Sequence, residues 1–366
     1  MDAVDAALVD ISNSLIKLID YRQYPLTQEL NKELKSVTSH SSIDYITRLD
    51  VRLGRLFADA ASSLLSDNNL HNSAITAIGC HGQTVLHRPE PPEPTTMQIG
   101  DPNLIAHITG ITTVADFRRM DIAAGGQGAP LTPVLHVHLF RHSVKNRVIV
   151  NIGGMANVTI LPAMNNTTSA VYGFDTGPGN VLLDEWTFKH TGQPIDSDGR
   201  WAASGTPNLK LLKHLLQDDY FDLAPPKSTG RDYFNLHWLQ AKLESFTQSC
   251  APKDIQATLV HLTAATITTA INNHASATQE LIVCGGGAHN PQLMRALARY
   301  LETCEVKTTG DLGINPDAVE AVAFAWLARC RLEGITGNLP GVTGASSPVL
   351  LGSVYAPPVK RCTTGR

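Results

Sequence analysis

The residue best placed for chemistry is an aspartate, Asp175, inside the glycine-rich stretch Gly173-Phe174-Asp175-Thr176-Gly177-Pro178-Gly179-Asn180. Residues 169–172 are expected to end a strand, and the apolar spacing of residues 181–190 predicts a helix whose first turn tolerates Pro178. Free backbone N–H groups at such a helix start favour an anion, commonly phosphate. A carboxylate beside a phosphate seat suits phosphoryl transfer, in which the carboxylate acts as the base. An ordinary Gly/Pro turn capped by an aspartate is the alternative interpretation.

A second polar cluster follows a buried strand expected at residues 111–115. Asp116, Arg118 and Arg119 precede a glycine-rich turn at residues 123–130. Arginine pairs with a carboxylate through two hydrogen bonds, and aspartate accepts hydrogen bonds from sugar hydroxyls. The cluster therefore suits an anionic, hydroxylated substrate. A charged surface loop is the alternative, although the adjoining glycines indicate close approach of the backbone to a partner.

Two turns at the ends of expected strands carry polar groups or glycines. His81 and Gln83 follow a short strand at residues 76–78 and could donate hydrogen bonds to a ligand oxygen. A turn histidine satisfied by its own loop is the alternative. Gly285-Gly286-Gly287 links a strand to a helix, which suits nucleotide phosphates or an adenosine face.

Three other features give weaker indications. Glu320 lies early in an apolar helix expected at residues 316–331, where the helix dipole explains an acid equally well. The basic loop at residues 226–231 resembles a phosphate loop by composition only, without the Walker spacing. His138 and His142 share one face of an expected helix, but no acidic ligand accompanies them, so we predict no metal cluster there.

Composition narrows the classes of protein to which the chain can belong. The 366 residues are enough for two domains, and 43% hydrophobic with 17% charged residues is an ordinary globular balance. A net charge of −4 without a basic block argues against nucleic acid as the partner, and no apolar run is long enough to span a membrane. The six cysteines include no C-x-x-C pair, which indicates reduced thiols in a cytoplasmic protein.

Together these motifs resemble the anhydro-N-acetylmuramic acid kinase family of bacteria. The matching stretches keep the family's order over nearly the whole chain and lie at residues 80–84, 97–100, 115–119, 123–130, 151–157, 173–180, 227–231, 284–290 and 320–326. The resemblance implies an α/β fold with the two lobes and central cleft of actin-like ATPases, which are ribonuclease H-like. Residues 1–130 would form the N-terminal lobe, on the substrate side and with part of the phosphate loop. Residues 131–366 would form the C-terminal lobe, with the nucleotide and the catalytic aspartate.

The resemblance also implies the reaction. The family uses ATP, with a divalent metal that is usually Mg²⁺, to convert 1,6-anhydro-N-acetylmuramic acid and water into N-acetylmuramic acid 6-phosphate and ADP. This reaction serves peptidoglycan recycling in the cytoplasm. The resemblance also implies that the protein is a homodimer. Asp175 would take a proton from the attacking water, and Glu320 would hold the sugar near its anhydro bridge. The implied metal travels with ATP, near Asp2, rather than in a side-chain cluster.

The remaining site residues implied by the resemblance fall into two sets. The substrate set is Asp2, His81, Gln83, Asp116, Arg118, Arg119, Gln127 and Gly128. The ATP set is Asp2, Asp5, Gly153, Gly154, Asn157, Gly177, Gly179, Asn180, Gly285, Gly286 and Gly287. Either Arg118 or Arg119 would meet the lactyl carboxylate of the sugar.

One departure from the family pattern lies at the start of the chain. The family begins with a strand and a Gly-Thr-Ser turn, whereas this sequence starts at the methionine that follows them, with Ala3 in place of the usual glycine. If that strand is lost, the first lobe's sheet has an unpaired position and one phosphate contact is missing. Either the sequence begins downstream of the true start, which we favour because every other motif is intact, or the chain is impaired. Three alternatives stay open: another sugar kinase of the same fold, an inactive nucleotide-binding homologue, and a glycoside hydrolase that needs no ATP.

Overall fold

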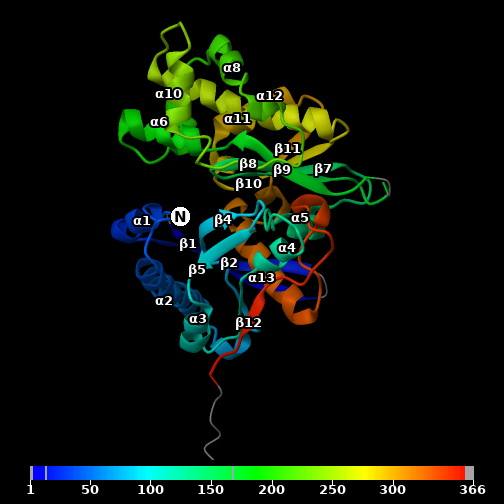
Figure 1. Cartoon of the computed structure of the whole chain (residues 1–366). Helices are drawn as coiled ribbons and strands as arrows, with labels where there is room; N and C mark the ends of the chain where they lie inside the picture. The colour runs from blue at the N-terminus through cyan, green and yellow to red at the C-terminus, as the bar shows by residue number, and fades with distance from the viewer. Residues whose placement is uncertain (1–2, 13–14, 167–168, 359–366) are drawn as a thin grey trace, which may run out of the picture. The chain divides into compact units, whose positions relative to one another are not determined.

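The computed structural model describes residues 3–12, 15–166 and 169–358 (Figure 1). The chain forms two compact units. Unit 1 comprises Met1–Leu135 together with Glu320–Arg366, and unit 2 comprises His136–Val319. The chain from Glu320 onward therefore belongs with the N-terminal unit, whereas the sequence-based division had placed it in the second lobe.

Unit 2 is built on a five-stranded mixed sheet in the order β11-β10-β7-β8-β9. The strands are β7 (Arg147–Ile152), β8 (Met155–Leu161), β9 (Tyr172–Pro178), β10 (Glu280–Cys284) and β11 (Glu305–Thr308). Strands β7, β8 and β9 form an antiparallel meander, and β10 pairs in parallel with both β7 and β11. The carboxyl ends of β7, β10 and β11 consequently meet at one edge of the sheet.

Alternating apolar residues explain how this sheet is covered. Val148, Val150 and Ile152 of β7 are fully buried and belong to the same core as Val158 of β8 and Leu262 of α11. Figure 1 shows α11 lying along the sheet. The helices of unit 2 are α6 (Val181–Thr191), α7 (Arg200–Ala203), α8 (Leu209–Leu215), α9 (Asp219–Asp222), α10 (Leu236–Glu244), α11 (Pro252–His274) and α12 (Pro291–Tyr300), with 3₁₀ turns at Ser197–Gly199, Gly286–His289, Thr309–Leu312 and Pro316–Ala318.

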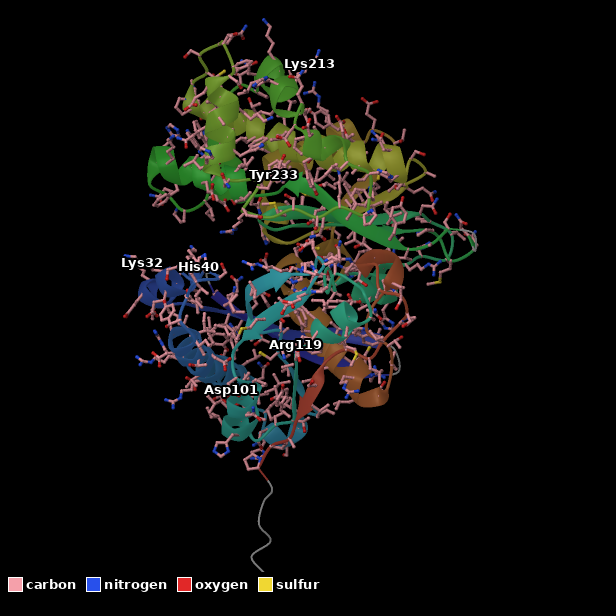
Figure 2. The ribbon with its side chains drawn as sticks, viewed as in Figure 1. Lys32, His40, Asp101, Arg119, Lys213 and Tyr233 are labelled. Atoms are coloured by element: carbon pink, nitrogen blue, oxygen red, sulfur yellow. The ribbon has the colours of Figure 1, made fainter. Side chains whose placement is uncertain are left out.

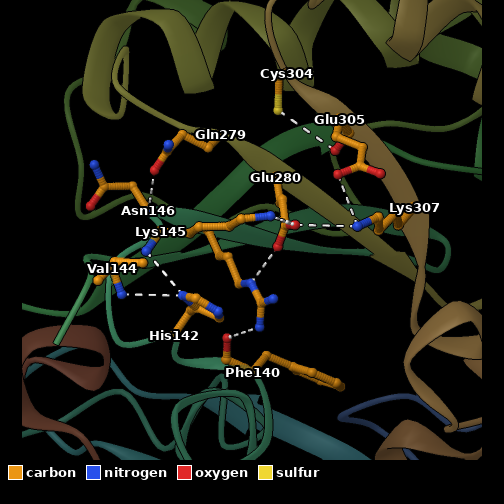
Figure 3. A network of polar contacts seen from close by, with 11 residues as sticks. Phe140, His142, Val144, Lys145, Asn146, Gln279, Glu280, Cys304, Glu305 and Lys307 are labelled. Atoms are coloured by element: carbon orange, nitrogen blue, oxygen red, sulfur yellow. Dashed lines mark hydrogen bonds and ion pairs between the residues drawn. The ribbon is translucent and has the colours of Figure 1, made fainter.

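A buried ion network joins the three parallel strands at their amino ends (Figure 3). Glu280, at the start of β10, is only 2% exposed. Lys145 donates to one carboxylate oxygen, Arg147 to the other at 2.6 Å, and Lys307 of β11 to the first at 3.2 Å. Burial raises the pKa of Glu280, but the hydrogen bonds from Lys145, Arg147 and Lys307 outweigh it and lower the pKa to about 2. The carboxylate therefore stays ionised and ties the strands together.

Unit 1 contains two hairpins, a small sheet and several helices. The hairpin strands are β1 (Ala3–Ser12) with β2 (Leu15–Pro25), and β4 (Gln83–Arg88) with β5 (Thr95–Ile99). The sheet has the order β12-β6-β3, from Ser353–Tyr355, Thr113–Ala115 and Ile78–Gly79. The helices are α1 (Gln28–Lys35), α2 (Ile43–Asp67), α3 (Pro102–Thr109), α4 (Arg119–Ala123) and α14 (Pro340–Thr343), with a 3₁₀ turn at Asn72–Ala74. Helices α5 (Pro133–Phe140) and α13 (Val319–Glu333) run across the two boundaries between units.

The packing of α13 explains why the end of the chain belongs to unit 1. Phe324 and Leu327 of α13 are buried against Val114 of β6 and Phe117 in one apolar cluster. The approach is close, because a Cβ on Gly79 of β3 would lie 2.1 Å from the Phe324 carbonyl oxygen. A side chain at residue 79 would therefore force the helix away from the sheet.

Most expected elements are present, and three expectations are wrong. The helix expected after Asn180 is α6, and the strand and helix expected on either side of residues 285–287 are β10 and α12. Asp101 accepts from the Asn103 N–H and caps α3, whose first residue is Pro102. However, β9 does not end at Tyr172, Pro178 ends this strand instead of starting a helix, and Gln83 begins the strand β4 instead of lying in a turn.

Two further points concern the described part of the chain. Within it, no helix combines the length and the apolar character needed to cross a membrane. Asp2, which the resemblance assigns to both the sugar and the nucleotide, lies outside the described residues.

Candidate active site

Asp175 lies in the middle of β9, and three contacts hold it. Its carboxylate Oδ2 accepts from the Thr229 N–H at 3.0 Å, its own N–H donates to the Lys227 carbonyl at 3.1 Å, and its carbonyl accepts from the Tyr220 hydroxyl at 2.8 Å. Burial raises the pKa of Asp175 to about 6, and the hydrogen bond from Thr229 only partly opposes this. A carboxylate with this pKa is suited to act as a base near neutral pH.

An aromatic cluster supports the residues that hold Asp175. The buried Asp218 accepts from the Tyr233 hydroxyl at 2.7 Å (Tyr233 is labelled in Figure 2), from the Trp238 indole at 2.9 Å and from Lys242 at 3.0 Å. The rings of Tyr220 and Tyr233 lie 6.0 Å apart. Because Asp218 also caps the short helix that carries Tyr220, the whole cluster fixes the hydroxyl that bonds to Asp175.

Replacing Tyr220 by Phe tests this support. The variant loses the hydrogen bond to the Asp175 carbonyl, so we expect a loss of about 1 kcal/mol in the free energy of unfolding. If Asp175 is the base, we also expect kcat to fall roughly three- to tenfold, because the carboxylate of Asp175 is held less firmly. Urea unfolding and steady-state kinetics measure the two effects.

Tyr172→Phe is the matched control, because Tyr172 is also on β9 and donates to the His274 carbonyl at 2.8 Å. This variant should lose comparable stability and keep its kcat. Equal values of kcat in the two variants would contradict a positioning role for Tyr220.

The start of α6 differs from the expected open anion seat. The N–H groups of Gly179, Asn180 and Val181 donate to the carbonyls of Gly153 and Gly154 at 2.8–3.1 Å. These three amides are therefore not free for phosphate. This packing of the two turns requires glycine at residue 179, because a Cβ on Gly179 would lie 2.4 Å from the Gly153 carbonyl oxygen. Gly177, at φ +145°, occupies backbone space that side-chain-bearing residues rarely adopt.

The carboxyl edge of the parallel strands gathers the other glycines assigned to ATP. Gly153 and Gly154 follow β7, and residues 285–287 follow β10. A Cβ on Gly285 would lie 2.3 Å from Oδ1 of Asn151, and one on Gly286 would lie 3.5 Å from Nδ2 of Asn180. Ligands of α/β proteins bind at this edge of a parallel sheet. The predicted nucleotide residues thus lie together, and their assignment to ATP stays a prediction.

Asn157, which the resemblance assigns to ATP, lies next to Asp175 in the sheet. It pairs with Asp175 across β8 and β9, so both side chains leave the same face of the sheet. Its Oδ1 is buried and has no hydrogen-bond partner among the described residues. This placement puts Asn157 beside Asp175.

Sequence reasoning gave little weight to the loop that lies beside Asp175. Lys227 and Thr229 form the backbone contacts described above, and the guanidinium of Arg231 lies beside Gly154, where a Cβ would be 3.5 Å from its Nε. The loop's basic composition was the one local indication of a function. Tyr220 and Asp218 carried no such pattern, because their role depends on contacts between distant parts of the chain.

In unit 1, Arg118 joins several of the residues assigned to substrate. Its Nε donates to Nε2 of His81 at 2.9 Å, and its Nη1 donates to the Gly128 carbonyl at 2.6 Å. His81 must therefore carry its proton on Nδ1, which donates to the Gly82 carbonyl at 2.8 Å. Burial and then the charge of Arg118 lower the pKa of His81 to about 3, so the imidazole is neutral.

Glu320, in the first turn of α13, acts on the same arginine. Burial lowers the pKa of Arg118 to about 10, while the negative charges of Glu320 and Asp121 oppose the shift. Asp121 is itself fully buried and holds the glycine turn, since it accepts from the Gly128 N–H at 2.7 Å. The structure therefore brings His81, Arg118, Gly128 and Glu320 together.

Arg119 points elsewhere. Its side chain, labelled in Figure 2, is 63% exposed. It pairs with Asp116 at 3.6 Å. Burial raises the pKa of Asp116, and Arg119 opposes the shift. The two residues line a pocket of about 210 Å³ together with Met120, Ala123, Gly352 and Ser353. The paired arginines of the sequence thus lie in two different environments.

The other predicted residues have local partners. The side chain of Gln83 donates to the Thr84 carbonyl at 3.1 Å, and the backbone N–H of Gln127 donates to the Thr343 carbonyl at 2.7 Å. Asp5 accepts from the Tyr21 hydroxyl and from Gln23. In the described residues, no group of three or more His, Cys, Asp or Glu side chains is placed to hold a metal ion.

Comparison with known proteins decides the family. Residues 1–357 match the family model described as anhydro-N-acetylmuramic acid kinase. The chain belongs to the anhydro-N-acetylmuramic acid kinase family. Two curated members of this kinase family, from Coxiella burnetii and Vibrio cholerae, are 48% and 46% identical over 357 and 360 residues. These alignments cover 97% and 98% of this chain and 94% and 96% of the relatives.

Solved structures resemble this kinase-family chain more distantly. The ethanolamine utilization protein EutJ from Carboxydothermus hydrogenoformans has a TM-score of 0.38 at 13% identity, over 88% of this chain and 89% of its own. A xylulose kinase from Rhodospirillum rubrum has a TM-score of 0.36 at 14% identity, over 70% of this chain and 50% of its own. At these scores the two structures are only distantly similar to this chain, whose own helices and strands form two compact α/β units.

Proposed function

We propose that this protein uses ATP and water to convert 1,6-anhydro-N-acetylmuramic acid into N-acetylmuramic acid 6-phosphate and ADP. Membership of the kinase family supports the substrate and the use of ATP. The observation that carries the chemistry is Asp175, a firmly held carboxylate whose pKa is raised to about 6. Such a group can accept a proton from water at neutral pH, which an ordinary exposed aspartate does poorly.

In this reaction Asp175 takes a proton from the water that attacks the anomeric carbon. The bond between this carbon and O6 breaks, and its electron pair stays on O6. O6 then bonds to the γ-phosphorus, while the bond to the β-γ bridging oxygen breaks and leaves ADP. The proton on Asp175 passes to solvent, so sugar phosphate, ADP and one proton are the products. Ring opening and phosphoryl transfer thus share one base.

We assign the sugar to the cluster in unit 1. Glu320 carries a negative charge that acts on Arg118, and Arg118 is hydrogen-bonded to His81 and Gly128. Arg118 is therefore already committed to protein groups through Nε and Nη1. Arg119 is exposed beside a pocket and pairs with Asp116 at the long distance of 3.6 Å, so its guanidinium is the better candidate for the lactyl carboxylate.

We assign the nucleotide to the carboxyl edge of unit 2, at Gly153, Gly154 and residues 285–287. The close approach of the second turn supports this assignment, because side chains on Gly285 and Gly286 would fill the space beside Asn151 and Asn180. Mg²⁺ would enter with ATP and neutralise charge on the phosphates, which together with water supply most of its ligands. We further propose that the protein acts in the cytoplasm as a homodimer, in peptidoglycan recycling.

The proposal is tested with the purified chain, the anhydro sugar, ATP and Mg²⁺, by mass spectrometry of the products. Sugar 6-phosphate and ADP in equal amounts are expected. Phosphorylation of a different sugar would support another sugar kinase, and release of N-acetylmuramic acid without ATP would support a hydrolase. ATP binding without turnover would identify an inactive homologue, and each of these three outcomes would overturn the proposal.

The pH dependence of the reaction provides a separate prediction. Asp175 works as a base only when it is deprotonated, and burial raises its pKa to about 6. We therefore expect kcat/KM to fall about tenfold per pH unit below pH 6 and to level off above it. Steady-state rates between pH 4.5 and 8.5 measure this, with circular dichroism at each pH to show that the fold is retained. An acid limb near pH 4, at the ordinary aspartate pKa, would contradict the assignment of Asp175 as the base.

A further inference from the structure

The loop at residues 227–231 is held firmly in unit 2. The Lys227 carbonyl accepts from the Asp175 N–H, and the Thr229 N–H donates to the Asp175 carboxylate. The Lys227 ammonium lies 4.7 Å from the centre of the Tyr220 ring and donates to the Tyr220 and Phe221 carbonyls. The loop's lysine is therefore used to fix the loop itself and is not available to a ligand.

The residues that follow Arg231 in the sequence hold its backbone in place. The N–H groups of Tyr233 and Phe234 donate to the Gly230 carbonyl, and the Asn235 side chain donates to the Arg231 carbonyl at 3.0 Å. Asn235 in turn caps α10. The backbone around Arg231 is thus tied to a helix and, through Thr229, to the reacting carboxylate.

The guanidinium of Arg231 contrasts with this ordered backbone. Its side chain is exposed, and within the described ranges no acidic side chain pairs with it. It lies over the Gly153–Gly154 turn, where a Cβ on Gly154 would be 3.5 Å from both Nε and Nη2. An arginine with an ordered backbone, an unpaired charge and a glycine beneath it is placed to receive an anion.

We propose that Arg231 binds the γ-phosphoryl group of ATP and stabilises its charge during transfer. This inference rests on the proposed function and adds a specific residue to it. The turn beneath Arg231 lies at the sheet edge that favours ligands, and Thr229, two residues away, holds the base. The loop at residues 227–231 therefore links the acceptor side of the reaction to the donor side. A guanidinium in this position stabilises charge on the transferred group most strongly in the transition state.

The test compares nucleotides that differ by one phosphate. In Arg231→Gln we expect binding of ATP to weaken tenfold or more, binding of ADP to change less than twofold, and kcat to fall at least a hundredfold. Arg231→Lys, which keeps the charge without the two-pronged geometry, should recover part of the ATP affinity. Calorimetric titration with ATP and ADP, together with steady-state kinetics, provides these values.

Arg200→Gln is the matched control, because Arg200 is an exposed arginine of the same unit that pairs with Asp198. Its affinities and kcat should equal those of the parent chain. Equal weakening of ATP and ADP in Arg231→Gln, no change in either, or a loss confined to sugar affinity would each overturn the inference. The parent chain could make no sugar phosphate while Arg231→Gln still binds ATP more weakly and ADP unchanged. In that case the proposed function would fail, and Arg231 would remain a γ-phosphate ligand.

Discussion

Replacing Asp175 by Asn is expected to lower kcat by about three orders of magnitude. The amide is nearly isosteric and can still accept from the Thr229 N–H, but it cannot take a proton from water. General-base catalysis typically contributes 10²–10⁴-fold, and this base serves the step on which phosphoryl transfer depends. Single-turnover kinetics with saturating ATP and sugar isolate the chemical step from product release.

The stability of the same variant separates a lost base from a damaged fold. The folded state raises the pKa of Asp175 from 3.8 to about 6, so ionising this group costs the folded state free energy at pH 7. Asparagine removes that cost, and the free energy of unfolding should be unchanged or higher. A kcat within tenfold of the parent value, with the fold intact, would show that another group is the base.

Replacing Glu280 by Leu is expected to lower the free energy of unfolding by about 3–5 kcal/mol, the range for breaking a buried ion pair on one side. The loss centres on Arg147, which is 12% exposed and also donates to the Phe140 carbonyl at 2.8 Å. Lys145 and Lys307 are more exposed and can turn towards water. Urea unfolding at pH 7 followed by circular dichroism measures the loss.

Glu305→Gln is the control for this network. Glu305 pairs with Lys307 at 2.9 Å but is 57% exposed, so its removal should cost less than about 1 kcal/mol. The advantage that ionised Glu280 gives to the parent chain should persist at neutral pH and disappear as the pH falls towards 2, because its folded pKa is lowered to about 2. Similar losses in the two variants would contradict the role assigned to Glu280.

Local pattern predicted the elements well where one residue type decides them. The glycines at residues 285–287 predicted the junction between β10 and α12, and the apolar spacing after Asn180 predicted α6. The pattern failed at β9, where glycine and proline suggested a turn. Pairing with β8 extends the strand to Pro178, and Gly173 is needed there because a Cβ would lie 2.5 Å from the Val158 carbonyl oxygen. Tertiary pairing overrides such local preferences.

In the candidate site too, some features could be predicted from local sequence and others depend on tertiary contacts. Asp175 was recognisable from its motif, but its raised pKa comes from burial, which the hydrogen bond from Thr229 only partly opposes. The residues that hold Asp175 in place, Tyr220 and Thr229, are 45 and 54 positions away in the sequence. Two adjacent arginines looked equivalent in the sequence, yet Arg118 is bonded to His81 and Gly128 while Arg119 lies beside a pocket. No spacing rule distinguishes such neighbours, because burial of each depends on which elements pack around it.

The central claim, that Asp175 directs water to the sugar while O6 takes the phosphoryl group, is tested most directly with ¹⁸O-labelled water. The purified chain converts the anhydro sugar and ATP in labelled water, and mass spectrometry locates the label in the product. Unlabelled N-acetylmuramic acid 6-phosphate, kept in the same water for the same time, corrects for exchange at the anomeric carbon. The account predicts one ¹⁸O at the anomeric hydroxyl and none in the phosphoryl group. Label in the phosphoryl group or in free phosphate would show that water attacks phosphorus and would contradict the account.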